Sequence, residues 1–196
     1  MMALGGLDIG STGCKVTVYG EDGRYLYRSY RDYPVSRNVG EHEVRAEDIR
    51  QGVFEALRDA ALHCPQLGAL GVTSFGESCV LLDEEDQPLR PVMLYTDPRG
   101  SRECGELTER LGKEYLEQVT GTAPHSMYSL PKLMWIRKHC PQEYSRTKRI
   151  LMMEDYIIYL LTGQAVIDYS LAVRSMAFDI RKLDWSQEIF EAAGID

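Results

Sequence analysis

The sequence lacks the long apolar runs, the excess of basic residues and the paired cysteines that mark three common classes of protein. No apolar stretch approaches the roughly 18 residues that a membrane helix needs, and Asp8 interrupts the N-terminal segment before a signal-peptide core forms. The formal net charge of −8 argues against a general binder of nucleic acid or anionic membranes. We therefore expect no nucleic-acid partner and no membrane partner.

The cysteine content also excludes a disulfide framework. There are five cysteines, an odd number, with no CxxC pair and no metal-ligand spacing. They are Cys14, Cys64, Cys79, Cys104 and Cys140. Reduced thiols are the expected state, which predicts a cytoplasmic protein. The four histidines are scattered and support neither a metal site nor a catalytic triad.

What the sequence does contain is a tight turn of small and polar residues near its start. Residues 7–15 hold one acid, two glycines, two hydroxyl side chains and a lysine: Asp8, Gly10, Gly13, Ser11, Thr12 and Lys15. After the turn, Val16 and Val18 alternate with other residues, which is strand periodicity. A P-loop turn opens a helix instead, so the pattern predicts a strand–turn–strand unit.

This turn has two interpretations. In the first, its glycines let backbone N–H groups approach a phosphate, Ser11 and Thr12 donate hydroxyl hydrogen bonds to it, and Lys15 supplies positive charge. Asp8 then holds Mg²⁺ directly or through water, because hard cations prefer oxygen ligands. In the second, the turn is an ordinary hairpin with glycines at positive φ. The motif alone leaves both interpretations open.

The order of elements predicts an α/β fold with a mixed sheet. Periodicity favours strands over residues 3–8, 15–19, 24–33, 67–75, 79–82 and 91–95, and helices over residues 46–63, 101–119, 129–139 and 154–161. Ser129 is the expected cap of the third helix. Residues 34–43 are expected to be loop, and residues 168–180 favour no element. An all-parallel sheet is excluded, because it needs a crossover helix after the first strand.

Several segments, read together, resemble a known family. Residues 7–15 resemble the first phosphate motif of the superfamily of actin, hexokinase and the Hsp70 chaperones, and residues 71–83 and 89–99 are similar to the sugar-site segment of the FGGY carbohydrate kinases. Further blocks agree in order: Thr120-Gly121, Pro131–Trp135, Asp155-Tyr156, Leu160–Gly163 and Asp184–Ser186. The resemblance implies a ribonuclease H-like mixed sheet flanked by helices, with an extra helical insertion. It also implies phosphoryl transfer from ATP, with Mg²⁺, to a hydroxyl of a sugar or polyol.

The resemblance implies roles for individual residues as well. For the cofactor, Asp8 matches the family's metal-associated acid, and the phosphate-facing positions are Gly10, Ser11, Thr12 and Lys15. For the substrate, Glu77 stands where glycerol kinases place a carboxylate on substrate hydroxyls and xylulokinases place a histidine. Gly76 replaces a bulkier arginine or methionine, so the pocket should differ in size or charge.

Two more positions belong to the implied substrate site. Tyr95 stands at an aromatic position that covers the apolar face of a sugar, and Asp97 would bind further hydroxyls, with Arg99 orienting its loop. Plainer interpretations stay open: Glu77 as a surface acid, Tyr95 as a core aromatic, and Asp97 as a turn former before Pro98.

The family's catalytic base is an aspartate in a glycine-rich stretch that residues 1–196 do not contain. We therefore expect these residues to be the N-terminal, substrate-binding lobe of a longer kinase, inactive alone and without its nucleotide-binding lobe. Exposed lobe surface predicts some self-association, in the simplest case a homodimer. A non-catalytic sugar-binding or sensing module is the alternative, and an actin-like scaffold is disfavoured by the sugar-site segment. Ketose, aldonate and polyol substrates all stay open.

Overall fold

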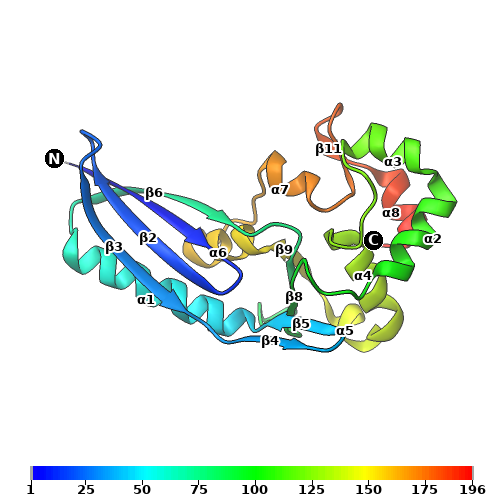
Figure 1. Ribbon diagram of the computed structural model, residues 1–196, viewed down its shortest axis with the longest axis horizontal. Coiled ribbons are helices and arrows are strands. Elements are labelled where there is room, and N and C mark those ends of the chain that lie inside the picture. Colours follow the sequence, from blue (N-terminus) through cyan, green and yellow to red (C-terminus); the bar gives the residue numbers. More distant parts are fainter. Residues whose placement is uncertain (1, 196) are drawn as a thin grey trace.

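The computed structural model describes residues 2–195 and contains a four-stranded mixed sheet (Figure 1). Its strands, in the order β3-β2-β1-β6, are β1 (Ala3–Ile9), β2 (Gly13–Gly20), β3 (Tyr25–Asp32) and β6 (Leu67–Ser74). The pairs β1–β2 and β2–β3 are antiparallel, whereas β1 and β6 are parallel. The structure therefore confirms the predicted mixed sheet, with the small polar turn as the hairpin between its first two strands.

Helix α1 (Ala46–His63) packs along this sheet, against β2 and β3 (Figure 1). Its buried residues are Ala46, Ile49, Gly52, Val53, Ala56 and Ala60. Because they recur every three or four residues, they form one apolar stripe, which joins the buried side chains of β1 and β2 in a single core. The helix ends where the Cys64 amide donates to the Ala60 carbonyl and Pro65 follows.

The expectation of a loop over residues 34–43 is wrong. The segment forms two strands, β4 (Val35–Asn38) and β5 (Glu41–Val44), which turn at Gly40 with φ of 84°. β5 also pairs with β8 (Val92–Met93), so β5 is the middle strand of a three-stranded sheet and β4 is one edge. Its partner lies about fifty residues away in sequence, which is why local periodicity misses these strands.

The single helix predicted over residues 101–119 is also wrong. The chain forms two helices, α2 (Ser101–Leu111) and α3 (Lys113–Thr120), separated by Gly112 at φ of 87°. A residue in that conformation ends a helix, and only glycine adopts it without steric cost. The apolar spacing continues across the break, because both helices bury residues in the same core.

The second half of the chain adds a mainly helical part with its own core (Figure 1). β7 (Cys79–Leu82) is shared: Val80 and Leu82 belong to the core of the sheet half, and Cys79 and Leu81 belong to the helical core. The remaining elements are α4 (Ser129–His139), α5 (Pro141–Arg146), β9 (Arg149–Met152), α6 (Met153–Thr162), α7 (Tyr169–Val173), β10 (Phe178–Asp179), β11 (Asp184–Trp185) and α8 (Gln187–Ala193). Within residues 2–195, no helix is long and apolar enough to span a membrane.

Candidate functional site

A polar cavity of about 390 Å³ opens where β6 ends. Its walls come from the end of β6 and the following loop, from two single residues of later loops, from the start of α6, and from the segment around α7. They are Thr73, Ser74, Phe75, Gly76, Glu77, Tyr95, Met127, Glu154, Asp168, Ser170, Leu171 and Arg174. The volume is in the range of small-molecule sites. Three of the four substrate-site residues predicted from sequence therefore meet here, and Asp97 is not in the wall.

Strand pairing puts the β1–β2 hairpin beside this cavity. In the parallel register, Asp8 is opposite Thr73 and Ile9 is opposite Ser74, so the last residues of β1 lie next to two cavity residues. The Phe75 amide donates to the Ile9 carbonyl at 2.9 Å, which extends the contact past the strand end. The hairpin turn begins at the next residue. The fold thus brings the predicted phosphate turn and the predicted sugar site together.

The hairpin needs its glycines for close packing. Neither Gly10 nor Gly13 has a positive φ, so the turn is not the hairpin with left-handed glycines that was the alternative. Instead, a Cβ on Gly10 would meet the Gly13 carbonyl at 2.9 Å, and one on Gly13 would meet the Arg31 carbonyl at 2.8 Å. The Tyr33 hydroxyl also donates to the Gly10 carbonyl. The backbone of the turn is therefore closely packed against neighbouring residues. Ser11 in the turn is half-buried and Thr12 is exposed.

Asp8 and Lys15 face each other across the hairpin. The Lys15 Nζ lies 2.7 Å from the Asp8 Oδ2, and both side chains are more than two-fifths exposed. Among residues 2–195, no group of three or more histidine, cysteine or acidic residues is arranged to hold a metal ion. Mg²⁺ bound with a nucleotide commonly takes one or two carboxylates and completes its shell with phosphate and water. A single exposed carboxylate beside two hydroxyls fits that kind of site, and it does not fit a metal site made by protein alone.

Glu77 is held in a strained conformation with its side chain in the cavity wall. Its φ is 67°, a region that non-glycine residues adopt rarely and most often at functional sites. The Ser129 hydroxyl donates to the Glu77 carbonyl at 3.0 Å and fixes this backbone. Ser129 therefore does not cap α4 as expected: Tyr128 is the N-cap, and it makes no side-chain cap bond.

The Glu77 carboxylate is nine-tenths buried, and one cation lies close to it. Arg174 Nη1 is 3.4 Å from Glu77 Oε1. Burial raises the pKa of Glu77, although the charges of Arg174 and Lys132 oppose the rise. A buried acid that borders an open cavity is a suitable acceptor for ligand hydroxyls. The alternative that Glu77 is a plain surface acid is wrong.

Gly76 makes room for that cation. A Cβ at this position would lie 3.2 Å from Cγ of Arg174 and 3.7 Å from Cδ2 of Leu171. A long side chain there would have to displace Arg174. The expected difference in pocket size and charge therefore has a structural basis, because the absent side chain leaves the space that Arg174 occupies.

Tyr95 and Asp97 have different surroundings. Tyr95 is 42% exposed and borders the cavity, so the alternative of a core aromatic is wrong. Asp97 is buried away from the wall, and its carboxylate accepts hydrogen bonds from the Arg99 side chain and from the amides of Arg99 and His42. Burial alone raises the pKa of Asp97, but these hydrogen bonds outweigh it and leave the pKa below its usual value. The expectation that Asp97 binds substrate stays a prediction, and its oxygens are already well supplied with donors.

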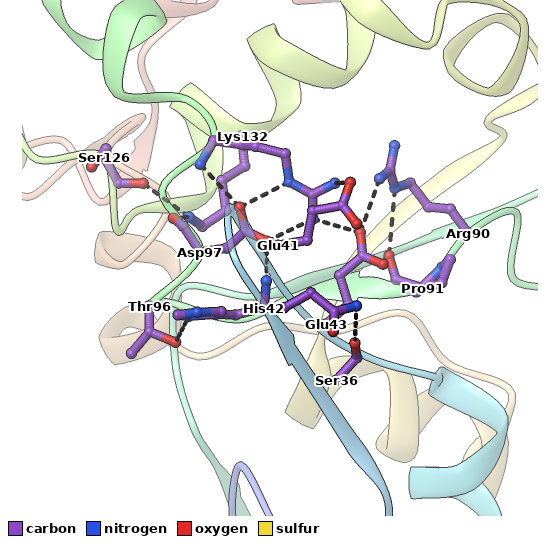
Figure 2. Close-up of polar contacts among 12 residues, drawn as sticks. Ser36, Glu41, His42, Glu43, Arg90, Pro91, Thr96, Asp97, Ser126 and Lys132 are labelled. Carbon is purple, nitrogen blue, oxygen red and sulfur yellow. Dashed lines mark hydrogen bonds and ion pairs between the residues drawn. The ribbon is translucent and has the colours of Figure 1, made fainter.

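Asp97, Arg99, Glu43 and Lys132 are joined by ion pairs and hydrogen bonds, and we call them the Asp97 network. Figure 2 labels Asp97, Glu43 and Lys132. Arg99 Nη2 lies 2.6 Å from Asp97 Oδ2 and 2.5 Å from Glu43 Oε1. The Lys132 ammonium donates to the carbonyls of Asp97 and Ser126, each at 3.0 Å. Burial lowers the pKa of Lys132 to about 8 against the attraction of Asp97. Arg99 holds the Asp97 side chain, and Lys132 ties the Asp97 loop to the segment that carries Met127.

Sequence reasoning missed three charged residues of the cavity, namely Glu154, Asp168 and Arg174. Asp168 caps α7, since its Oδ1 accepts from the Leu171 amide at 2.8 Å. Burial, followed by the charge and hydrogen bond of Asp168, raises the pKa of Glu154 to about 7. The Asp168 cap signal three residues before Leu171 was visible in the sequence. Its meeting with Glu154 depends on how α6 and α7 pack.

A second cavity, of about 230 Å³, is the weaker candidate for a sugar. Its lining is mainly apolar, with side chains such as Leu133, Ile167 and Phe190. Asp155 also lines it, with one carboxylate oxygen that has no hydrogen-bond partner, and burial raises the pKa of Asp155 to about 7. A molecule covered with hydroxyls needs many polar partners, and the polar cavity offers them.

Known proteins are similar to this chain over nearly its whole length. A family profile described as the FGGY family of carbohydrate kinases, N-terminal domain, matches residues 3–196. A xylulose kinase from Lactococcus lactis subsp. lactis (strain IL1403) is 31% identical over 97% of this chain and 39% of its own length. A gluconokinase from Bacillus subtilis (strain 168) is 29% identical over 97% of this chain and 38% of its own length. Among solved structures, one described as a xyloylose kinase from Brucella ovis is 25% identical with a TM-score of 0.92, over 98% of this chain and 40% of that chain. This chain therefore spans about 40% of the length of the relatives it matches.

Proposed function

The chain belongs to the FGGY family of carbohydrate kinases, and we propose that it forms the substrate-binding lobe of a kinase that phosphorylates a hydroxyl of a sugar or polyol with ATP. One observation carries the proposal. The polar cavity that holds Glu77 and Tyr95 adjoins the glycine hairpin, through the Phe75–Ile9 hydrogen bond and the Asp8–Thr73 register. Phosphoryl transfer requires the acceptor hydroxyl and the phosphates to be held side by side.

In the proposed complex, the cavity residues bind the sugar. Glu77 accepts hydrogen bonds from two neighbouring hydroxyls, because a carboxylate offers two oxygens. Tyr95 covers the apolar face of the sugar ring or chain with its exposed ring. Asp97 and the rest of its network keep the Tyr95 loop in place, and direct contact of Asp97 with the substrate stays a prediction.

The hairpin faces the phosphates in the same proposal. The Gly10 amide already donates to the Gly13 carbonyl at 2.9 Å, so the Ser11 and Thr12 hydroxyls are the donors to phosphate oxygens. Lys15 adds positive charge, and Asp8 holds the Mg²⁺ directly or through water. Bound Mg²⁺ neutralises charge on the phosphates. The Lys15–Asp8 pair keeps the carboxylate in place before the metal ion binds.

The proposed setting is the cytoplasm, because the five cysteines are all free and four of them are buried. Unpaired thiols of this kind persist in a reducing compartment.

Sugar binding by this chain is the first test. Isothermal titration with D-xylulose, xylitol, glycerol and gluconate should show binding of at least one of them. Glu77→Gln should weaken that binding about tenfold or more, because it removes a charge-assisted hydrogen bond. Glu84→Gln is the matched control, since Glu84 is an exposed acid outside the cavity. Absence of binding to the whole panel, or equal effects of the two variants with both folded, would contradict the proposal.

Turnover is the second test. With ATP, Mg²⁺ and the sugar that binds, this chain alone should give no phosphorylated product. The hairpin offers one acid, one lysine and two hydroxyls to the phosphates and their metal ion, too few groups to hold a triphosphate in line with the acceptor. Robust phosphorylation by the isolated chain would show that it carries a complete active site.

A further inference from the structure

The cavity wall carries more negative than positive side chains. Glu77, Glu154 and Asp168 are its acids, and Arg174 is the one cationic side chain in the wall among residues 2–195. Thr73, Ser74 and Ser170 add neutral hydroxyls. With all groups ionised, the wall has a net charge of −2, from three acids and one base.

Arg174 does not neutralise the remaining acids. Its guanidinium already lies 3.4 Å from Glu77, and its side chain is about half exposed to solvent. Lys132 also acts on Glu77 from a distance, but its ammonium donates to the carbonyls of Asp97 and Ser126 and lies outside the wall. An anionic group entering the cavity would therefore meet Glu154 and Asp168 without a free cation of the described chain beside them.

Glu154 and Asp168 form a close acidic pair from two different elements. Glu154 lies in the first turn of α6 and is nine-tenths buried. Asp168 is fixed at the N-cap of α7 by its bond with the Leu171 amide. Both side chains line the same cavity, and Asp168 adds to the effect of burial in raising the pKa of Glu154. Burial therefore restricts the Glu154 side chain, and the cap bond holds the exposed Asp168 side chain at the start of α7.

We propose that this cavity selects uncharged polyhydroxy substrates, ketoses or polyols, and rejects aldonates, with Glu154 and Asp168 as the specificity-determining residues. The inference rests on the proposed function. Hydroxyl groups donate hydrogen bonds to carboxyl oxygens, whereas a ligand carboxylate has no proton to donate and repels a like charge. Two of the similar proteins are described as a xylulose kinase and a gluconokinase, so family membership does not distinguish neutral from anionic substrates. In this proposal, the charge of the cavity wall makes that distinction.

Matched ligand pairs test the inference. Xylitol and xylonate, glucitol and gluconate, and glycerol and glycerate each differ only by a CH₂OH group in place of a carboxylate. Titrated calorimetrically into this chain at pH 8, the neutral member of any pair that binds should bind at least about tenfold more tightly, as expected for a like charge brought into a partly buried site. D-Xylulose is titrated alongside as the ketose.

Variants assign the effect to the acidic pair. Glu154→Gln keeps the shape of the side chain and removes its charge, so the ratio of neutral to anionic affinity should fall several-fold. Asp168→Asn should act in the same direction, and it keeps an oxygen that can cap α7. Glu84→Gln, which removes a charge outside the cavity, should leave the ratio unchanged. Thermal unfolding of each variant confirms that it is folded.

The outcomes separate the two proposals. If a neutral sugar or an aldonate binds but the aldonate of a pair binds equally or better, the selectivity inference is overturned while the sugar-binding function stands. If the neutral member binds more tightly but Glu154→Gln and Asp168→Asn leave the ratio of neutral to anionic affinity unchanged, the assignment of selectivity to these two residues is overturned. If no ligand of either kind binds, the proposed function itself fails.

Discussion

Glu77 and Asp97 are two buried carboxylates with opposite surroundings. Glu77 borders a cavity, has one cation at 3.4 Å, and burial holds its pKa above the usual value. Asp97 is enclosed by Arg99 and by backbone amides, and these bonds outweigh its burial and lower its pKa. Burial alone therefore does not mark a ligand-binding acid. We expect a ligand-binding acid to have an incomplete set of protein partners beside open space, and a structural acid to have a complete set.

Removing the arginine from each site should have the largest and most unequal effect. Arg99→Met leaves Asp97 and Glu43 largely buried without their main partner, so the free energy of unfolding should fall by about 3–5 kcal/mol. Arg174→Met removes a single 3.4 Å contact of a half-exposed guanidinium, and Glu77 still borders the open cavity, so the free energy should fall by less than about 1 kcal/mol. Urea unfolding followed by circular dichroism measures both. Equal losses of stability in the two variants would contradict the difference between the Glu77 and Asp97 sites.

Lys132 tests whether the Asp97 network is a structural unit. Lys132→Met leaves the carbonyls of Asp97 and Ser126 without their donor, which should lower the free energy of unfolding by about 1–3 kcal/mol. The control is Lys113→Met, which removes an exposed ammonium whose partner Glu117 is also exposed, and which should change stability by less than about 0.5 kcal/mol.

The same variant has a predicted pH dependence. Burial lowers the pKa of Lys132 to about 8 from 10.5, so the unfolded chain binds more protons between these values. The wild type should therefore gain stability relative to Lys132→Met as the pH rises from 8 to 10.5. A stability difference that is flat across this window would show that the ammonium is not held in a buried environment.

The contributions of Glu154 and Asp97 to the free energy of unfolding should depend on pH with opposite sign. The pKa of Glu154 is raised from 4.5 to about 7, so the folded chain binds more protons in this window and loses stability as the pH rises through it. Glu154→Gln should therefore be more stable than the wild type above pH 7, by about 1–2 kcal/mol, and should lose this advantage by pH 4.5.

Asp97→Asn should show the reverse pattern. The pKa of Asp97 lies below 3.8, so its stabilising effect is fully present above that value and is lost as the pH falls below it. The variant should be less stable than the wild type at neutral pH, and the deficit should shrink in acid. Acid and neutral urea titrations of both variants make the measurement, and parallel pH profiles would contradict the contrast.

Gly76 should give the smallest effect. Gly76→Ala places a Cβ 3.2 Å from Cγ of Arg174, a flexible and half-exposed side chain, so stability should fall by less than about 1 kcal/mol. The displaced guanidinium should nevertheless change sugar affinity measurably. Gly6→Ala, where a Cβ meets nothing within 4 Å, is the control and should leave affinity unchanged.

The sequence predicted best what depends on neighbouring residues. The hairpin between β1 and β2 and the exact span of α1 follow from alternation, glycine placement and helical spacing within short windows. Helix α6 and its stop at Gly163, which has a φ of 73°, follow from the same signals. The cavity residues Glu77 and Tyr95 were reached through family resemblance.

What was missed depends on contacts between distant segments. β5 pairs with the distant strand β8 as well as with β4, and Ser129 bonds to Glu77 instead of capping its own helix. Glu154 and Asp168 become a pair only when α6 and α7 pack at the end of β6. Asp97 matched the family motif, and no local signal could show that Arg99 and His42 occupy its oxygens.

The central claim is that sugars bind in the cavity and not at the Asp97 network. Nuclear magnetic resonance of the ¹⁵N-labelled chain, titrated with xylitol or D-xylulose, tests it residue by residue. The account predicts that amide shifts change around Gly76, Glu77 and the 168–174 segment, while the amides of His42 and Arg99 change little. Shifts centred on His42 and Arg99, or no shifts at saturating sugar, would contradict it.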